Sequence, residues 1–187
     1  MSVSVEAITK YYGSQKALDE VSFTVDPGQV VGFLGPNGAG KSTMMKIITC
    51  FLPPSSGKVT VDGFDVRESP VEVRRRVGYL PEHNPLYLDM YVKEFLVFIG
   101  GIQLGRAEAE KRTARMIELT GLGPEQKKKI GALSTGYRQR VGLAQSMLHD
   151  PADPNLGVST LPNGAGVLVR ALAAAPSQVH GRLLAIY

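Results

Sequence analysis

The stretch Gly35-Pro-Asn-Gly-Ala-Gly-Lys-Ser-Thr43 decides the fold of this 187-residue chain. It has the form G-x-x-x-x-G-K-[ST], whose glycines let the backbone curl so that successive N–H groups point at one anion. Lys41 adds a mobile positive charge, and the Ser42 hydroxyl can ligate Mg²⁺. The pattern predicts a loop that binds the phosphates of a nucleotide. Its candidate residues are Gly35, Pro36, Asn37, Gly38, Ala39, Gly40, Lys41, Ser42 and Thr43.

The sequence on both sides of the loop supports this prediction. Residues 29–34 (QVVGFL) are typical of a short buried strand, and residues 43–48 (TMMKII) open a helix. A helix that begins at such a loop favours phosphate, because its unpaired N–H groups and its dipole attract negative charge. A Gly-rich turn without a ligand would not need the Lys-Ser pair after the last glycine.

Composition limits the class of protein. The length predicts one domain, or one domain and a fragment, and a hydrophobic content of 43% is ordinary for a globular chain. The net charge is +4, but the basic runs at 74–76 and 127–129 are short and flanked by polar helical sequence. We interpret them as solvated faces rather than as a nucleic-acid or lipid patch, and we expect no nucleic-acid partner. The single cysteine, Cys50, excludes an internal disulfide and is interpreted as a core thiol.

The N-terminal residues have neither the basic nor the apolar segment of a signal peptide. The longest apolar stretch, at 95–99, is far too short to span a bilayer. We therefore expect a cytoplasmic protein whose contact with a membrane comes through a partner.

Two further motifs are candidates on chemical grounds. Tyr12 precedes a glycine turn, where an aromatic ring can stack on a purine, although such a tyrosine is more often only a turn residue. In residues 133–140 (LSTGYRQR), Ser134 is the expected N-cap of a helix and Gly136 lies in its first turn. Such a helix start can bind an anion, although most Ser caps bind nothing.

Residues 91–121 have the spacing of helices rather than of strands. Apolar side chains recur at 95, 98, 99 and 102 in one segment and at 116, 117 and 119 in the next. An all-helical insert after an α/β beginning predicts a subdomain, at about 83–149, that could reach a partner.

In this order, the motifs resemble those of the ATP-binding subunit of an ABC transporter. The resemblance includes the aromatic loop with Tyr12, the phosphate loop, Glu82 after a strand at 77–80, the helical insert, and a signature sequence at 133–137. It covers residues 2 to about 150. It implies an α/β P-loop NTPase fold of ABC type, with an antiparallel β subdomain, a parallel core sheet and a helical insert.

The chain departs from the common family pattern at two of these positions. Most members have Gln where this chain has Glu82, and Gly-Gly-Gln where it has residues 135–137 (TGY). A carboxylate at position 82 could still hold Mg²⁺ or a water molecule. The sequence at 79–91 and the Tyr137-Arg-Gln-Arg variant of the signature resemble the gliding-motility type of exporter subunit.

The resemblance also implies ligands and partners. ATP and Mg²⁺ would bind between two copies of the subunit, with the phosphate loop of one facing Ser134 and Gly136 of the other. A transmembrane permease would be driven through the helical insert, at the inner face of the cell membrane. Hydrolysis would be an in-line attack of water on the γ-phosphate, with Lys41 and Mg²⁺ stabilising the charge.

The family pattern stops near residue 150. The family next has an apolar strand ending in Asp-Glu and later a switch histidine, but residues 151–187 contain no Lys, no Glu and no such strand, and His180 has no matching context. We therefore expect an incomplete nucleotide-binding domain at 1–150 that lacks the C-terminal part of its core, followed by a low-charge Ala/Gly/Pro-rich segment at 151–187. Without the missing strands, the phosphate-loop strand would have unpaired backbone, and ATPase activity would be weak or absent.

Three hypotheses stay open at this point. The chain is the ATPase subunit of an ABC exporter, or a nucleotide-binding module that regulates a complete partner without hydrolysis, or a product without function. The third is suggested because back-translating residues 151–156 and sliding by one base permits an apolar strand, as a shifted reading frame would. A P-loop kinase or GTPase is disfavoured, because neither needs the element at 133–137.

Overall fold

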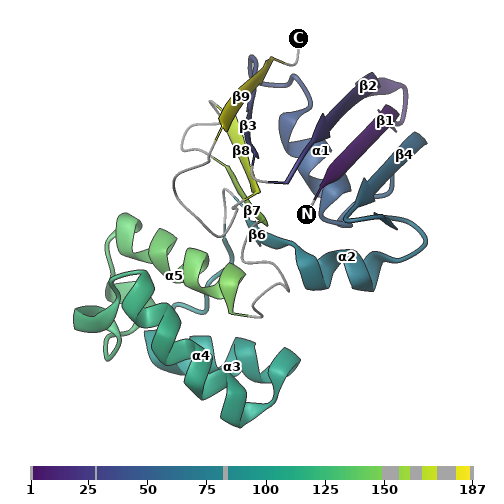
Figure 1. The fold of residues 1–187 in the computed structure, drawn as a ribbon. Helices are drawn as coiled ribbons and strands as arrows, with labels where there is room; N and C mark the ends of the chain where they lie inside the picture. The colour runs from purple at the N-terminus through teal and green to yellow at the C-terminus, as the bar shows by residue number, and fades with distance from the viewer. Residues whose placement is uncertain are drawn as a thin grey trace. The chain divides into compact units, whose positions relative to one another are not determined.

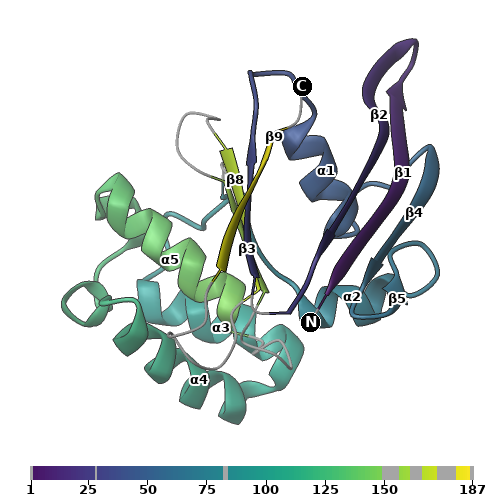
Figure 2. The ribbon, with the colours of Figure 1, turned by 45° about the horizontal axis from the view of Figure 1, so that its top comes forward.

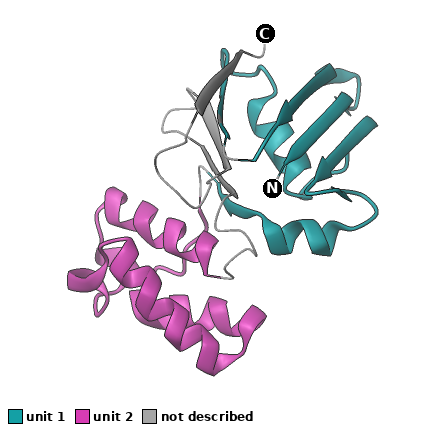
Figure 3. Ribbon diagram, in the orientation of Figure 1, with its two compact units in different colours: residues 1–82, 151–187 teal, residues 83–150 magenta. Residues whose placement is uncertain are grey.

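The computed structural model describes residues 2–27, 29–81 and 84–148, and the backbone of three strands at 156–160, 166–171 and 180–185. The chain divides into two compact units, shown in Figure 3. Unit 1 consists of Met1–Glu82 and Pro151–Tyr187, and unit 2 of His83–Asp150. Among the described residues, no helix has the length and apolar character needed to cross a membrane.

The N-terminal part of unit 1 is an antiparallel sheet with the strand order β2-β1-β4-β5 (Figure 1). Apolar and polar residues alternate at 3–9 and 21–25, which predicts half-buried antiparallel strands, and two strands form there, each longer than the alternation. The hairpin turn contains Gly13, whose φ of 59° suits glycine. The strands are β1 (Val3–Tyr12), β2 (Gln15–Val25), β4 (Ser56–Val61) and β5 (Phe64–Asp65).

The second sheet of unit 1 contains the strand that leads into the phosphate loop. Its order is β6-β7-β8-β3-β9, so β3 is an inner strand (Figures 1 and 2). The strands are β3 (Gln29–Leu34), β6 (Gly78–Leu80), β7 (Leu156–Thr160), β8 (Gly166–Ala171) and β9 (His180–Ala185).

Two expectations about this sheet are wrong. The backbone of β3 is paired on both sides, antiparallel with β8 and parallel with β9, so it has no free edge. The core sheet is also mixed rather than parallel, because β7 and β8 pair antiparallel. Only residues 161–165 join these two strands, and a parallel pair would need a crossover of a dozen or more residues.

Helix α1 (Lys41–Ile48) packs between the two sheets of unit 1 (Figures 1 and 2). Its apolar residues Met44, Met45, Ile47 and Ile48 are all buried, whereas Ser42 and Lys46 are exposed. Cys50 follows it, half-buried against the same core, and burial raises the pKa of its thiol. The interpretation of Cys50 as a core thiol is confirmed. The shared core includes Val5, Ile8, Val31, Phe33, Met44, Met45, Ile47, Ile48, Val59 and Val61.

Unit 2 is helical, and the short basic helix α2 (Pro70–Arg76) of unit 1 precedes it in the chain. Its core contains Phe95, Leu96, Met116, Ile117, Leu122, Ile130, Leu133, Val141, Ala144 and Leu148. The elements are α3 (Val92–Leu104), α4 (Arg106–Leu119), α5 (Thr135–Met147) and the 3-10 turns η1 (Gly123–Glu125) and η2 (Ile130–Ala132).

The apolar surface of α3 is wider than the core of unit 2 covers. Phe95 is 1% exposed, whereas Phe98 is 48% and Ile102 is 69% exposed. At 100° per residue, Phe98 and Ile102 lie at one edge of the apolar arc of α3, and this edge faces away from the centre of the core. Helical spacing is therefore confirmed, but it does not separate the buried residues of α3 from the exposed ones.

Two phenylalanines of α3 test this difference in burial. Phe95→Ala should lower the free energy of unfolding of unit 2 by about 3–5 kcal/mol, because it removes a buried ring. Phe98→Ala should change it by less than about 1 kcal/mol, because that ring is half exposed. Urea unfolding followed by helical circular dichroism measures both. Equal losses for the two variants would contradict the assigned burial.

Candidate functional site

The loop between β3 and α1 is held close to β2. Gly38 and Gly40 have φ angles of 87° and 83°, in the region that favours glycine. A Cβ atom added at Gly40 would lie 2.4 Å from the carbonyl oxygen of Ala17 and 2.6 Å from the Cδ2 atom of Leu18. Position 40 therefore admits only glycine, both for its backbone angle and for its distance from β2.

Lys41 lies at the centre of the loop. Its side chain is buried, and its Nζ donates hydrogen bonds of 2.7 Å to the carbonyl oxygens of Gly35 and Pro36. These bonds hold the ammonium group inside the curl of the backbone, where a phosphate group would bring the compensating charge.

The start of α1 offers backbone donors next to this ammonium. The backbone N–H groups of Lys41, Ser42 and Thr43 donate no hydrogen bond to any residue that the structure describes. The N–H of Ala39, by contrast, donates one of 3.2 Å to the carbonyl oxygen of Pro36. Free N–H groups and the positive end of the helix dipole point the same way. Together with Lys41, they form an arrangement suited to a polyanion such as a nucleotide phosphate chain.

A magnesium ion fits this loop only in company with a nucleotide. Ser42 is exposed and offers one hydroxyl group. The described residues contain no group of three His, Cys, Asp or Glu side chains that could hold a metal ion. Mg²⁺ prefers six oxygen ligands, so most of them would come from phosphate oxygens and water.

Tyr12 ends strand β1 in the same unit as the loop. Its side chain is 45% exposed, and the Nζ of Lys10 lies 5.7 Å from the centre of its ring. Lys10 pairs with Leu18, the residue that contacts Gly40, and Tyr12 lies two residues further along β1. At about 3.4 Å per residue, Tyr12 lies roughly 7 Å along the strand from Lys10, which is beside the Leu18–Gly40 contact. One hairpin thus carries both the predicted stacking ring and the wall of the phosphate loop.

Ser134 is the N-cap of α5, as the sequence predicts. Its Oγ accepts a hydrogen bond of 3.4 Å from the backbone N–H of Tyr137. Ser134 and Gly136 are exposed, and a Cβ atom at Gly136 would meet nothing within 4 Å. This helix start is therefore open to solvent. It belongs to unit 2, whereas Tyr12 and the phosphate loop belong to unit 1; Glu82 lies outside the described residues.

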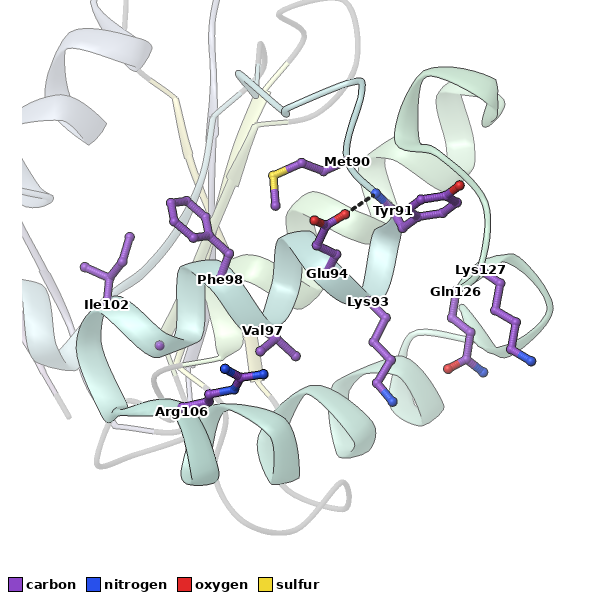
Figure 4. Close-up of a pocket in the computed structure, with 11 residues that line it drawn as sticks. Met90, Tyr91, Lys93, Glu94, Val97, Phe98, Ile102, Arg106, Gln126 and Lys127 are labelled. Atoms are coloured by element: carbon purple, nitrogen blue, oxygen red, sulfur yellow. Dashed lines mark hydrogen bonds between the residues drawn. The ribbon is translucent and has the colours of Figure 1, made fainter.

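A groove on unit 2 was missed by the sequence analysis. It has a volume of about 940 Å³ and follows the outward edge of α3 (Figure 4). The sequence signal that could have revealed it is the number of apolar residues in α3, which is larger than one buried face of a helix needs. Its lining includes Met90, Lys93, Val97, Phe98, Gly101, Ile102, Arg106 and Lys127.

Comparison with known proteins agrees with the motifs. The sequence pattern of the ABC transporter family matches residues 18–152. The ABC transporter ATP-binding protein NatA of Bacillus subtilis (strain 168) is 41% identical over 138 residues, covering 73% of this chain and 56% of NatA. The probable multidrug ABC transporter ATP-binding protein YbhF of Escherichia coli (strain K12) is 37% identical over 166 residues, covering 85% and 28%.

A solved structure shows the same fold. The dimeric ATP-binding cassette MJ0796 bound to ADP and phosphate has a TM-score of 0.69 and 26% identity, covering 80% of this chain and 70% of that one. The chain spans about half the length of NatA and less of YbhF. The matched region includes both the phosphate loop and Ser134. With its α/β P-loop NTPase fold, the chain belongs to the ABC transporter family.

Proposed function

We propose that this chain is the ATP-binding subunit of an ABC-type membrane exporter and that it binds MgATP at residues 35–43. The arrangement around Lys41 carries the proposal. A buried ammonium beside unpaired helix N–H groups is costly unless an anion accompanies it, and a nucleotide phosphate chain supplies that anion. Tyr12 would stack on the base, and Ser42 would give Mg²⁺ one ligand.

The second half of the proposed site comes from another copy of the subunit. Ser134 and Gly136 are exposed at the start of α5 and could face the γ-phosphate of an ATP bound to the other phosphate loop. The dimeric cassette MJ0796, bound to ADP and phosphate, supports such an association by analogy. Glu82 would lie beside the same phosphate, according to the family resemblance.

ATP hydrolysis by this chain is proposed to be deficient. A water molecule that attacks the γ-phosphate needs a carboxylate to orient it. Strand β7 follows α5 in the chain and pairs with β6, but its last residues are Ser159 and Thr160 rather than Asp-Glu. This observation favours a second candidate function, a nucleotide-binding module that regulates a complete partner. A shifted reading frame at 151–187 is the other explanation, and sequencing the gene across these codons separates the two.

A transmembrane permease is the proposed partner, and the groove along α3 is its proposed contact. The groove has an apolar floor that includes Phe98 and Ile102, and Gly101 leaves a gap where a helix backbone can approach. Among the described residues, Lys93 and Lys127 at the groove form no ion pair, and Glu94, which also lines it, accepts a hydrogen bond from the N–H of Tyr91. The fitting occupant is a helix of the permease with an apolar face and acidic flanks. The subunit would then lie at the inner face of the cell membrane.

According to the family resemblance, the permease would select the transported substrate. The gliding-motility type remains our proposal for the kind of exporter. It is supported by the resemblance at 79–91 and by Tyr137-Arg-Gln-Arg in the signature.

Nucleotide binding tests the proposed function directly. Lys41→Met should weaken the binding of a fluorescent ATP analogue in the presence of Mg²⁺ by about 100-fold, because a charge-assisted contact to phosphate is lost in a buried site. Lys46→Met, on the exposed side of the same helix, should leave the affinity unchanged. Equal affinities for both variants would contradict the assigned site.

Hydrolysis can be measured on the same preparation. We expect the chain to bind MgATP but to release phosphate at least about 100-fold more slowly than a complete member of the family, because the orienting carboxylate is lacking. A coupled phosphate-release assay gives the rate. A turnover within about tenfold of the complete protein would overturn the proposed deficiency.

The groove can be tested with a synthetic amphipathic helix of about 14 residues, with leucines on one face and glutamates on its flanks. Ile102→Ser should weaken its binding by at least about tenfold in fluorescence anisotropy, because a leucine-sized contact is removed. Leu119→Ser, at an exposed apolar position outside the groove, should have no effect. The same peptide with lysines for glutamates should bind worse; equal binding would contradict the proposed charge preference.

A further inference from the structure

Arg138 donates hydrogen bonds to two backbone carbonyl groups, that of Ser134 and that of Gly131 before it. It lies in the first turn of α5, where its own N–H donates a hydrogen bond of 2.9 Å to the carbonyl oxygen of Ser134. Its Nη2 atom donates one of 2.8 Å to the carbonyl oxygen of Gly131. Arg138 is therefore hydrogen-bonded to both ends of the segment 131–134.

The carbonyl group that accepts the Arg138 bond belongs to a fixed segment. Gly131 N–H donates to Leu88 O at 2.8 Å, and Ile130 N–H donates to Met90 O at 3.0 Å. Ile130 is fully buried, and a Cβ atom at Gly131 would lie 3.1 Å from Leu88 O. Because Gly131 is tied to the segment before α3, its carbonyl group offers Arg138 a rigid anchor.

Ser134 is weakly held by its own contacts. Its cap bond to Tyr137 is 3.4 Å long, near the limit for a hydrogen bond, and its side chain is exposed. Gly136 adds no side chain to this turn. Buried Leu133 fixes the backbone only on the preceding side. Tyr137 packs partly buried against the core of unit 2, and the side chain of Arg138 adds a hydrogen bond from the first turn of α5 to the segment before the cap.

The guanidinium group is also partly enclosed. Its Nε atom is buried and has no hydrogen-bond partner among the described residues. A buried donor without a partner costs free energy, so the side chain would leave this position unless another contact offset the cost. The charge-assisted bond from Nη2 to Gly131 is the contact that does so.

We propose that Arg138 is the positioning residue for Ser134 and Gly136. By joining α5 to the anchored carbonyl of Gly131, it sets the direction in which the cap faces the ATP of the second copy. Arg138 itself touches no nucleotide. The inference rests on the proposed function of Ser134. Arg138 would contribute to that function indirectly, by positioning the backbone of the cap.

Amide exchange measured by NMR on the full chain tests the positioning without any nucleotide. Arg138→Met should speed exchange of the amides at 137 and 138 by about tenfold or more, while the amides at 141–147 stay as in the parent chain. Arg115→Met, which removes an exposed arginine of α4 in the same unit, should change neither set. An unchanged rate at 137 and 138, or a uniform increase along α5, would overturn the proposal.

Self-association in MgATP supplies the functional readout. Arg138→Met should weaken it by about tenfold or more, while binding of the fluorescent ATP analogue by the monomer stays the same. Arg138→Lys should recover part of the loss, because lysine can still donate one hydrogen bond to Gly131. In a double-mutant cycle, Ser134→Ala with Arg138→Met should cost no more than Ser134→Ala alone. Additive losses would contradict an action through Ser134.

The two measurements separate failure of this inference from failure of the proposed function. If the parent chain binds no ATP analogue or never self-associates, the proposed function falls, and amide exchange still decides whether Arg138 holds the cap. If the parent chain associates and Arg138→Met associates equally well, the role of Arg138 is overturned and the proposed function stands.

Discussion

The close approach of Gly40 to β2 is the constraint on which the arrangement of unit 1 depends. With 2.4 Å between an added Cβ atom and Ala17 O, the phosphate loop and the antiparallel sheet can meet only if residue 40 is glycine. This contact sets where α1 begins and therefore where its free N–H groups point. It also ties the hairpin that carries Tyr12 to the loop that carries Lys41, so the two parts of the proposed nucleotide site are positioned by one contact.

Much of the fold and of the candidate site could be predicted from the sequence, because the signals are local. Alternation of apolar residues predicts β1 and β2, and a phosphate-loop pattern between a strand and a helix predicts β3 and α1. The Ser134 cap is likewise a property of three or four neighbouring residues. Such features depend on backbone angles and hydrogen bonds within one turn, which the residue types largely set.

The rest depends on partners far away in the sequence. Whether Phe98 is buried depends on how much of α3 the other helices of unit 2 cover, not on its spacing from Phe95. β8 runs antiparallel to β7 because the connection between them is short. Both strands lie in 151–187, where the sequence does not show the apolar strand that the family has. The bond from Arg138 to Gly131 requires that η2 be anchored to Leu88. Spacing along the chain carries no information about these contacts.

This difference between local and distant determinants also separates binding from hydrolysis. The groups proposed to bind phosphate, an ammonium and consecutive backbone N–H groups, all lie within residues 35–43 and need only β2, β3 and α1 to hold them. Hydrolysis requires in addition a carboxylate brought to the γ-phosphate by another strand. A chain can therefore keep a complete phosphate loop while a change elsewhere in its sheet removes turnover. Nucleotide binding and nucleotide hydrolysis are for this reason separate properties of this fold.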